Sequence, residues 1–175
     1  MTPEQRKFRD IIGSFSTGML VTRSARGSLH ARPLATVTDP QGAQGGTIHF
    51  ATSLDSPKVK EIEADPTVLV TLQGKARWAV VHGTAVVVRD RAVIDRFWSE
   101  EWRVFFPGGR TDPLLCLLEF TPMAGEYWDD RGIAGVRAAA NRDRALAAGR
   151  SLETDDAHEH AKVQGAAQPE ARERS

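Results

Sequence analysis

Apolar and polar residues alternate along the chain as far as residue 130 with two periods, that of an amphipathic helix and that of a half-buried strand. The chain opens with Thr2-Pro3-Glu4-Gln5, which matches a capping box, and apolar residues then recur at the spacing of one helical face. These apolar residues are Phe8, Ile11, Ile12 and Phe15. The pattern predicts an amphipathic helix over residues 3–15.

Short runs of β-branched and other apolar residues, separated by turn residues, predict a series of antiparallel strands. The runs cover residues 19–23, 29–37, 47–51, 67–72, 77–88, 114–120 and 123–128. Gly74-Lys75 suits a tight hairpin turn, and Gly83 suits a bulge inside a long strand. Two further helices are expected, one that starts at Ser56-Pro57 and one that Asp90 caps.

A sheet of this kind leaves its edges exposed unless it closes on itself. We therefore expect a mainly β fold with short helices, a six-stranded antiparallel split β-barrel with peripheral helices. The same edge argument favours pairing of two subunits. Residues 1–135 would form this single domain, which is an ordinary size for a chain of 175 residues.

Beyond Gly135 the sequence consists mainly of Ala, Arg, Glu, Asp and Gln, with almost no large apolar side chain. Such a composition buries too little surface to offset the entropy of ordering the chain. Residues 136–175 are therefore predicted to form a disordered tail that contributes nothing to the core.

Charge and cysteine content exclude several classes of protein. The chain has 23 basic (Lys plus Arg) and 23 acidic residues, so no net field attracts it to nucleic acid. It shows neither a secretory signal pattern nor an apolar run long enough to span a membrane, which predicts a cytoplasmic protein. Cys116, the single cysteine, lies in an apolar run and is expected to be a buried, unreactive thiol.

Sequence motifs for nucleotide, hydrolase and metal chemistry are weak or missing. The glycine patterns of a Rossmann site and of a P-loop are absent, and the serines lie in no nucleophile-elbow context. His30, His49 and His82 lie on three predicted strands, where they could converge on a metal or serve as ordinary sheet residues. We expect ordinary sheet residues and no metal.

The stretch from Phe50 to Lys58 consists of an apolar strand, hydroxyl side chains, a turn and a helix start. Lys58 in the first helical turn opposes the positive end of the helix dipole. The placement becomes favourable if Lys58, the free backbone N–H groups and the hydroxyls of Thr52, Ser53 and Ser56 share an anion. The alternative is an exposed lysine on a surface helix.

Arg32 lies in the middle of a predicted strand and precedes Pro33, which cannot donate to a β-ladder. The pair predicts an edge or broken strand whose arginine points toward an anionic group. A surface salt bridge would account for the same pattern. Both Arg32 and Lys58 are expected to face solvent when no ligand is bound.

Taken together, these segments resemble the flavin-binding split barrels related to pyridoxamine 5′-phosphate oxidase, especially the general stress protein branch. The resemblance covers residues 5–130 and depends on the order and spacing of several motifs. They lie at residues 19–22, 29–34, 48–52, 56–58, 82–85 and 90–92, and from Trp98 through 105–109 to 111–113.

The resemblance implies that FMN lies in a groove at the interface of a homodimer. Arg32, Ser56 and Lys58 would hold the phosphate, and residues 51–53 would contact the ribityl chain and the ring. The whole set of implied cofactor-binding residues is His30, Arg32, Pro33, Leu34, Phe50, Ala51, Thr52, Ser53, Ser56, Lys58, Trp102 and Phe105.

Three aromatic residues, Trp102, Phe105 and Phe106, would form a wall beside the flavin ring. Alternatively, they would belong to the core and to the dimer interface.

This chain departs from the oxidases at the phosphate. The oxidases carry a lysine five positions after the strand arginine and an arginine before the helix lysine, where this chain has Val37 and Pro57. A charge-assisted hydrogen bond contributes about 1.5–3 kcal/mol, so losing both predicts much weaker FMN binding unless backbone donors compensate. The basic C-terminal segment of the oxidases is also missing, and pyridoxamine phosphate oxidation is not expected.

We therefore expect a stress-associated oxidoreductase that uses FMN, with the redox chemistry supplied by the flavin and no evident protein acid or base. One alternative is a stress protein that binds or sequesters flavin without turnover. Another is a reductase that uses a larger deazaflavin. The sequence identifies no catalytic residue, electron donor or substrate.

Overall fold

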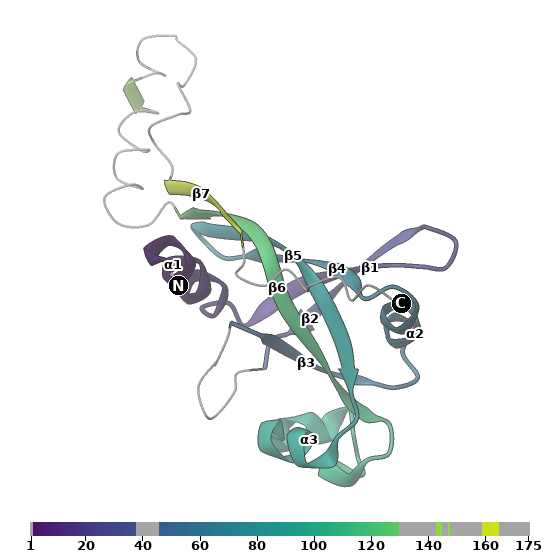
Figure 1. Cartoon of the computed structure of the whole chain (residues 1–175). Helices are drawn as coiled ribbons and strands as arrows, with labels where there is room; N and C mark the ends of the chain where they lie inside the picture. The colour runs from purple at the N-terminus through teal and green to yellow at the C-terminus, as the bar shows by residue number, and fades with distance from the viewer. Residues whose placement is uncertain (1, 38–45, 130–142, 145–146, 148–158, 165–175) are drawn as a thin grey trace.

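The computed structural model describes residues 2–37, 46–129, 143–144, 147 and 159–164. These residues form a curved antiparallel sheet with helices at its margins (Figure 1). The strands are β1 (Thr17–Arg23), β2 (Leu29–Ala35), β3 (Ile48–Ser53), β4 (Thr67–Gln73), β5 (Arg77–Val88), β6 (Leu115–Asp129) and β7 (Glu159–Gln164). The helices are α1 (Pro3–Ile12), α2 (Pro57–Ala64) and α3 (Arg91–Phe97), with 3₁₀ turns η1 (Glu100–Val104) and η2 (Gly109–Thr111).

The strand order in the described sheet is β2-β1-β4-β5-β6-β3, with β7 as a further partner of β6. One edge of β6 pairs with β5, and the other pairs with β3 over residues 115–120 and with β7 over residues 124–129. The sheet curves until the end of β2 approaches β3, where Val37 forms a single bridge to His49. The sheet is thus open along this line, and the predicted mainly β split barrel is confirmed.

Local capping interactions fix the helix starts as the sequence indicates. The Thr2 hydroxyl accepts a hydrogen bond from the Gln5 N–H, and the Gln5 side chain accepts one from the Thr2 N–H. The Asp90 carboxylate accepts from the first N–H groups of α3, and Pro57 occupies the first turn of α2. Among the described residues, no helix is long and apolar enough to cross a membrane.

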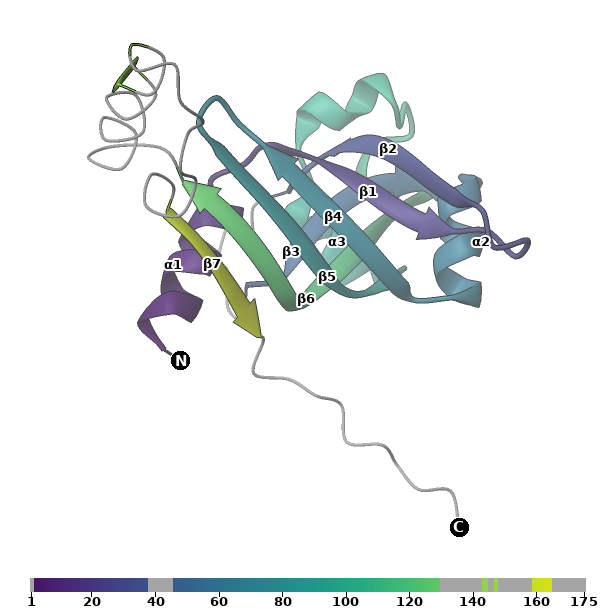
Figure 2. The same ribbon diagram turned by 90° about the horizontal axis from the view of Figure 1, so that it is seen from above.

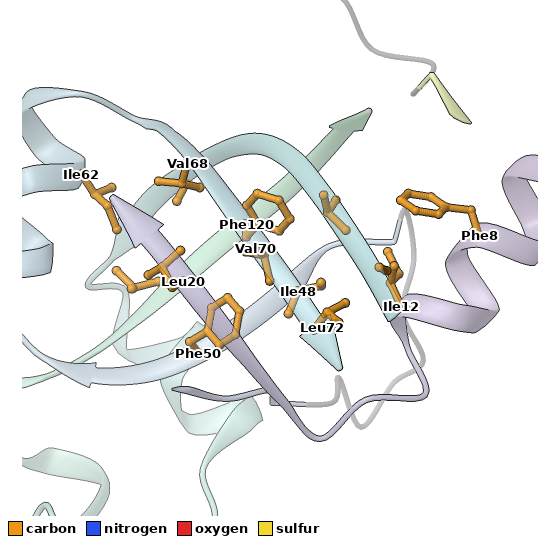
Figure 3. Packing of buried hydrophobic residues seen from close by; sticks show 14 of the residues in the cluster. Phe8, Ile12, Leu20, Ile48, Phe50, Ile62, Val68, Val70, Leu72 and Phe120 are labelled. Carbon is orange, nitrogen blue, oxygen red and sulfur yellow. The ribbon is translucent and has the colours of Figure 1, made fainter. Parts of the chain in front are cut away.

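The main core lies inside the curved sheet, between α1 and α2, which sit at opposite ends of the molecule (Figure 2). Leu20, Phe50 and Phe120 are fully buried within it (Figure 3). A smaller cluster forms under α3 and η1, and its buried members are Ile94, Phe97, Phe106, Leu115 and Leu117. Two cores separated by the β3–β6 ladder leave a surface between the open edge of the sheet and the α3–η1 segment.

The register of β5 against β6 shifts between His82 and Gly83, which confirms the predicted bulge. A Cβ atom on Gly83 would lie 2.1 Å from the carbonyl oxygen of Thr121, so only glycine permits this close approach. Pro122 lies opposite Gly83, where the ladder is already irregular and a missing N–H is tolerated. The pairing of β5 with β6 continues on both sides of this shift, so β6 is one continuous strand. The prediction of two separate strands over 114–128 is therefore wrong.

Strand β7 corrects the prediction of a disordered tail for residues 159–164 and adds a seventh strand to the predicted six. Val163 is 7% exposed and joins the main core, and the Gln164 carbonyl accepts a hydrogen bond from Gln5 Nε2 at 3.1 Å. The open edge of β6 supplies backbone partners that composition alone does not reveal. Apart from residues 143–144 and 147, the rest of the predicted tail lies outside the described residues.

Candidate functional site

A groove of about 520 Å³ opens between β2, β3 and the segment that contains η1. Its lining is mostly apolar, and Thr52 and Ser53 bring hydroxyl groups to it from the end of β3. The smaller core cluster supports one side, since Val37, Ala51 and Trp102 pack against that cluster. The lining residues are Pro33, Leu34, Ala35, Val37, Ala51, Thr52, Ser53, Trp102, Phe105 and Phe106.

The aromatic wall of the groove combines fixed and exposed rings. The rings of Trp98 and Trp102 meet edge to face with centroids 5.7 Å apart, and Phe106 is 7% exposed in the smaller core cluster. Phe105, in contrast, is 77% exposed. Large apolar side chains are seldom left this open beside a concave apolar surface unless something covers them.

Lys58 joins the groove to the start of α2. Its Nζ donates hydrogen bonds to Thr52 Oγ1 at 2.7 Å and to Ser56 Oγ, which uses two of its three donors. The residue is buried, at 9% exposed. Burial lowers the pKa of Lys58, and the positive charge of Arg32 lowers it further.

Arg32 is tied to an acidic partner on α2. Its Nη2 donates to Glu61 Oε2 at 3.0 Å and its Nη1 donates to Thr22 Oγ1 at 2.7 Å. Thr22 in turn donates to Glu61, and His30 Nδ1 lies 2.6 Å from Glu61 Oε1. We call the group Arg32, Lys58, Glu61, Thr22 and His30 the polar cluster.

The ionisation of Glu61 is fixed by this environment. Burial raises the pKa of its carboxyl group, but hydrogen bonds with Thr22, His30 and Arg32 outweigh that effect and hold the pKa at about 2. The carboxylate is therefore an anion at neutral pH. The anionic group that the sequence expected opposite Arg32 is, in the described structure, a side chain of the same chain.

The structure brings most of the predicted cofactor-binding residues to one region. Those that line the groove are Pro33, Leu34, Ala51, Thr52, Ser53, Trp102 and Phe105. Lys58 is linked to the groove through Thr52, and Ser56 is linked to it through Lys58. His30 and Arg32 do not line the groove and bind Glu61 instead. Phe50 does not reach the groove, because its side chain is fully buried in the main core (Figure 3).

Two expectations about exposure are wrong. Lys58 is buried and the side chain of Arg32 is 21% exposed, whereas both were expected to face solvent. Ser56 precedes α2 as its N-cap, yet its hydroxyl makes no capping hydrogen bond and accepts from Lys58 instead. The hydroxyls near Lys58 thus solvate the ammonium group, which reduces the cost of burying it.

Sequence reasoning missed Glu61 and Thr22 as partners of Arg32, together with the groove residue Ala35. Glu61 looks like one of the polar residues on the outer face of α2. Its spacing one turn after Lys58, next to Ile62, is a signal that it lies on the buried side of the helix. Val37 entered the sequence analysis only as the position where the oxidases carry a lysine, and its bridge to His49 brings it to the groove.

The remaining candidates take no part in the groove. Cys116 is fully buried, and burial raises its pKa to about 11, which confirms the expected unreactive thiol. His49 stacks on Phe97 and lies 3.2 Å from Glu119 through Nε2. Among the described residues, no group of three His, Cys, Asp or Glu side chains is arranged to hold a metal.

A split barrel with an apolar groove beside a buried lysine and a partly buried arginine defines a class of small β-proteins rather than a single activity. The chain belongs to the family described as pyridoxamine 5′-phosphate oxidase like, whose model matches residues 3–153. The match ends before β7, so that strand lies outside the part of the chain that the family model describes.

Several relatives are general stress proteins. General stress protein 26 of Bacillus subtilis is 30% identical over 124 residues, which cover 67% of this chain and 83% of the relative. A crystal structure described as a general stress protein 26 from Jannaschia sp. CCS1 superposes with a TM-score of 0.71 at 29% identity, covering 94% of this chain and 99% of that one. The general stress FMN/FAD binding protein of Xanthomonas citri gives a TM-score of 0.62 at 27% identity, covering 75% and 92%. These similarities confirm the expected resemblance.

Proposed function

We propose that the groove binds a flavin nucleotide and that the protein is a flavin-dependent oxidoreductase, with FMN as the cofactor that the sequence resemblance implies. The observation that carries the proposal is the continuity of the groove with the polar cluster, through the hydrogen bond from Lys58 Nζ to Thr52 Oγ1. An apolar, partly aromatic groove with two cations beside it suits a molecule with an aromatic ring system and a phosphate.

Each part of the groove has a role in this proposal. Trp102 and Phe105 would contact the ring system, and Thr52 and Ser53 would donate or accept hydrogen bonds to polar atoms of the ribityl chain or the ring. Lys58 and Arg32 would attract the phosphate. When bound, the flavin would supply two-electron transfer, and these residues would hold and orient it.

We infer that the functional unit is a homodimer. Val104 and Phe105 are 76% and 77% exposed at the rim of the groove, and β2 is an edge strand with a proline in it. A second copy placed over this rim would cover the exposed apolar side chains and shield the flavin from water. A cytoplasmic location agrees with the single, buried cysteine of the chain.

The proposal that the groove binds a flavin is tested by titrating the purified protein with FMN, followed by visible spectroscopy and calorimetry. Saturable binding with a shifted flavin spectrum is expected, and bleaching by NADH or NADPH without air would establish turnover. Absence of any binding would remove the proposal. Riboflavin, which has the same ring and ribityl chain but no phosphate, serves as the control for the contribution of the phosphate.

A non-catalytic, flavin-sequestering role is the second candidate. The observation that favours it is the groove lining, in which the described residues provide no carboxylate, imidazole or ammonium group. The expected distinction is simple: a sequestering protein would bind the flavin but would protect it from reduction by nicotinamide nucleotides, while an oxidoreductase would accelerate that reduction.

A further inference from the structure

The polar cluster contains a carboxylate at the point where a phosphate would bind. Glu61 is 8% exposed and lies on α2 one turn after Lys58. Its Oε2 accepts from Arg32 Nη2 at 3.0 Å. A carboxylate held this close to the arginine of an anion site reduces the positive charge that the site offers to a ligand.

Three side chains determine the net charge of the polar cluster. Arg32 and Lys58 are cations, and hydrogen bonding keeps Glu61 ionised, so the cluster has a single net positive charge when His30 is neutral. The groups whose charges act on Lys58 are Arg32, Cys116 and Glu61, and Cys116 is a neutral thiol at neutral pH.

The contact between Arg32 and Glu61 also limits how a phosphate can approach. The guanidinium uses Nη1 for Thr22 and Nη2 for Glu61, and only 21% of the Arg32 side chain is exposed. A phosphate that contacts the remaining N–H groups therefore comes close to the Glu61 carboxylate as well. Repulsion between these two anions grows with the charge on the phosphate.

We propose that Glu61 is a specificity-determining residue that makes the phosphate end of the groove favour a monoanionic phosphodiester over a phosphate dianion. The proposal rests on the proposed flavin function and deepens it. A phosphodiester carries one negative charge, which the cluster neutralises. A phosphomonoester such as that of FMN carries nearly two at neutral pH, which leaves a negative charge without a partner in a poorly solvated site.

The consequence is a ligand class defined by charge. Flavin phosphodiesters, in which the phosphate next to the ribityl chain is esterified on both sides, are expected to bind at least as well as FMN.

The test uses three ligands with one ring system and increasing charge: riboflavin, the methyl phosphodiester of FMN, and FMN. Dissociation constants are measured at pH 8, where imidazoles are ordinarily neutral and the FMN phosphate is a dianion. For the natural protein, we expect the methyl diester to bind at least as tightly as FMN. Reproducibly tighter binding of FMN than of the diester would overturn the proposal without any variant.

Glu61→Gln keeps the size of the side chain and an amide oxygen for Arg32 and Thr22, and it removes the charge. We expect this variant to shift the ratio of the two affinities toward FMN by about tenfold and to leave riboflavin binding unchanged. Glu63→Gln is the matched control, because Glu63 lies on the same helix, is half exposed and pairs with Arg89.

The outcomes separate this inference from the proposed function. If flavins bind but Glu61→Gln changes the affinities for both phosphates in parallel, Glu61 is only structural and the inference is wrong while the flavin site remains. If the variant and the Glu63→Gln control shift the ratio equally, a general charge effect accounts for it and the inference is again wrong. If the natural protein binds none of the three ligands, the proposed function is wrong and the inference falls with it.

Discussion

Lys58 and Glu61 lie one turn apart on α2, are 9% and 8% exposed, and do not form an ion pair with each other. Lys58 donates to Thr52 and Ser56, whereas Glu61 accepts from Arg32 and Thr22. Opposite charges at this spacing usually pair directly when they are on a helix surface. Here the two charges have separate hydrogen-bond partners. The ammonium group binds hydroxyls at the end of β3 and in the turn before α2, and the carboxylate binds side chains of β1 and β2.

This arrangement predicts a trade-off between stability and ligand binding at Lys58. Burial lowers the pKa of Lys58, so folding disfavours its charged form when no anion is bound. Lys58→Met should keep or raise the free energy of unfolding of the ligand-free protein and should weaken FMN binding by about tenfold or more.

Urea unfolding and calorimetric titration measure the two effects in the Lys58→Met variant. Lys60→Met, at an exposed position of the same helix, is the matched control and should alter neither quantity appreciably. A loss of stability in Lys58→Met without loss of affinity would show that the lysine is structural.

Acid should weaken the fold through Glu61. Because its pKa in the folded protein is about 2, below the ordinary value of 4.5, its contribution to stability is fully present above pH 4.5. The contribution is lost as the pH falls from about 4.5 to 2, since the unfolded chain takes up the proton first. Glu61→Gln should flatten this part of the curve of unfolding free energy against pH, measured by urea unfolding, and an unchanged slope would contradict the assignment.

Removal of β7 should destabilise the protein. Truncation after residue 158 exposes the β6 edge over residues 124–129 and removes Val163 from the core. We expect a loss of about 1–3 kcal/mol in the free energy of unfolding, visible as a lower melting temperature.

Flavin affinity should change little in the truncated protein, because the groove lies beside β2 and β3, away from the β6–β7 ladder. Lys162→Ala is the control, since the Lys162 side chain is exposed and its ammonium group pairs with Glu126 on the surface. An unchanged melting temperature in the truncated protein would restore the prediction of a tail that contributes nothing.

Assembly should depend on Phe105. Phe105→Asp places a charge at an apolar rim that is expected to be covered by a second copy, so it should shift the protein toward monomer in sedimentation at micromolar concentration. FMN should raise the melting temperature of the natural protein and favour the dimer. A natural protein that is monomeric and still binds FMN stoichiometrically would rule out a flavin site shared between two copies.

Much of the fold could be predicted because its determinants are local. The capping box at Thr2, the bulge glycine at position 83 and the cap at Asp90 each act within a few residues, and all three are present in the structure. The continuity of β6 and the existence of β7 were not predicted, since they depend on a partner edge that is distant in sequence.

In the candidate site, too, groupings of residues that are close in sequence could be predicted and contacts between distant residues could not. Thr52, Ser56 and Lys58 lie close together in sequence, so their grouping could be predicted, although the sequence analysis expected them to share an anion and in the structure Lys58 donates to the two hydroxyls. The pairing of Arg32 with Glu61 joins a strand to a helix across the barrel, and no local pattern reports it. An arginine that looks available to a ligand in the sequence is therefore already paired in the fold.

The shared outer edge of β6 has a consequence for the order in which the molecule opens. β3 covers one half of that edge and β7, which follows β6 only after residues 130–158, covers the other. Ordering such a distant strand costs more conformational entropy than closing a hairpin, so local unfolding should begin at β7. Amide hydrogens over residues 124–129 that face β7 should then exchange with solvent before those over residues 115–120. The end of the barrel nearest α1 would thus unfold locally and transiently while the end that contains the groove stays folded.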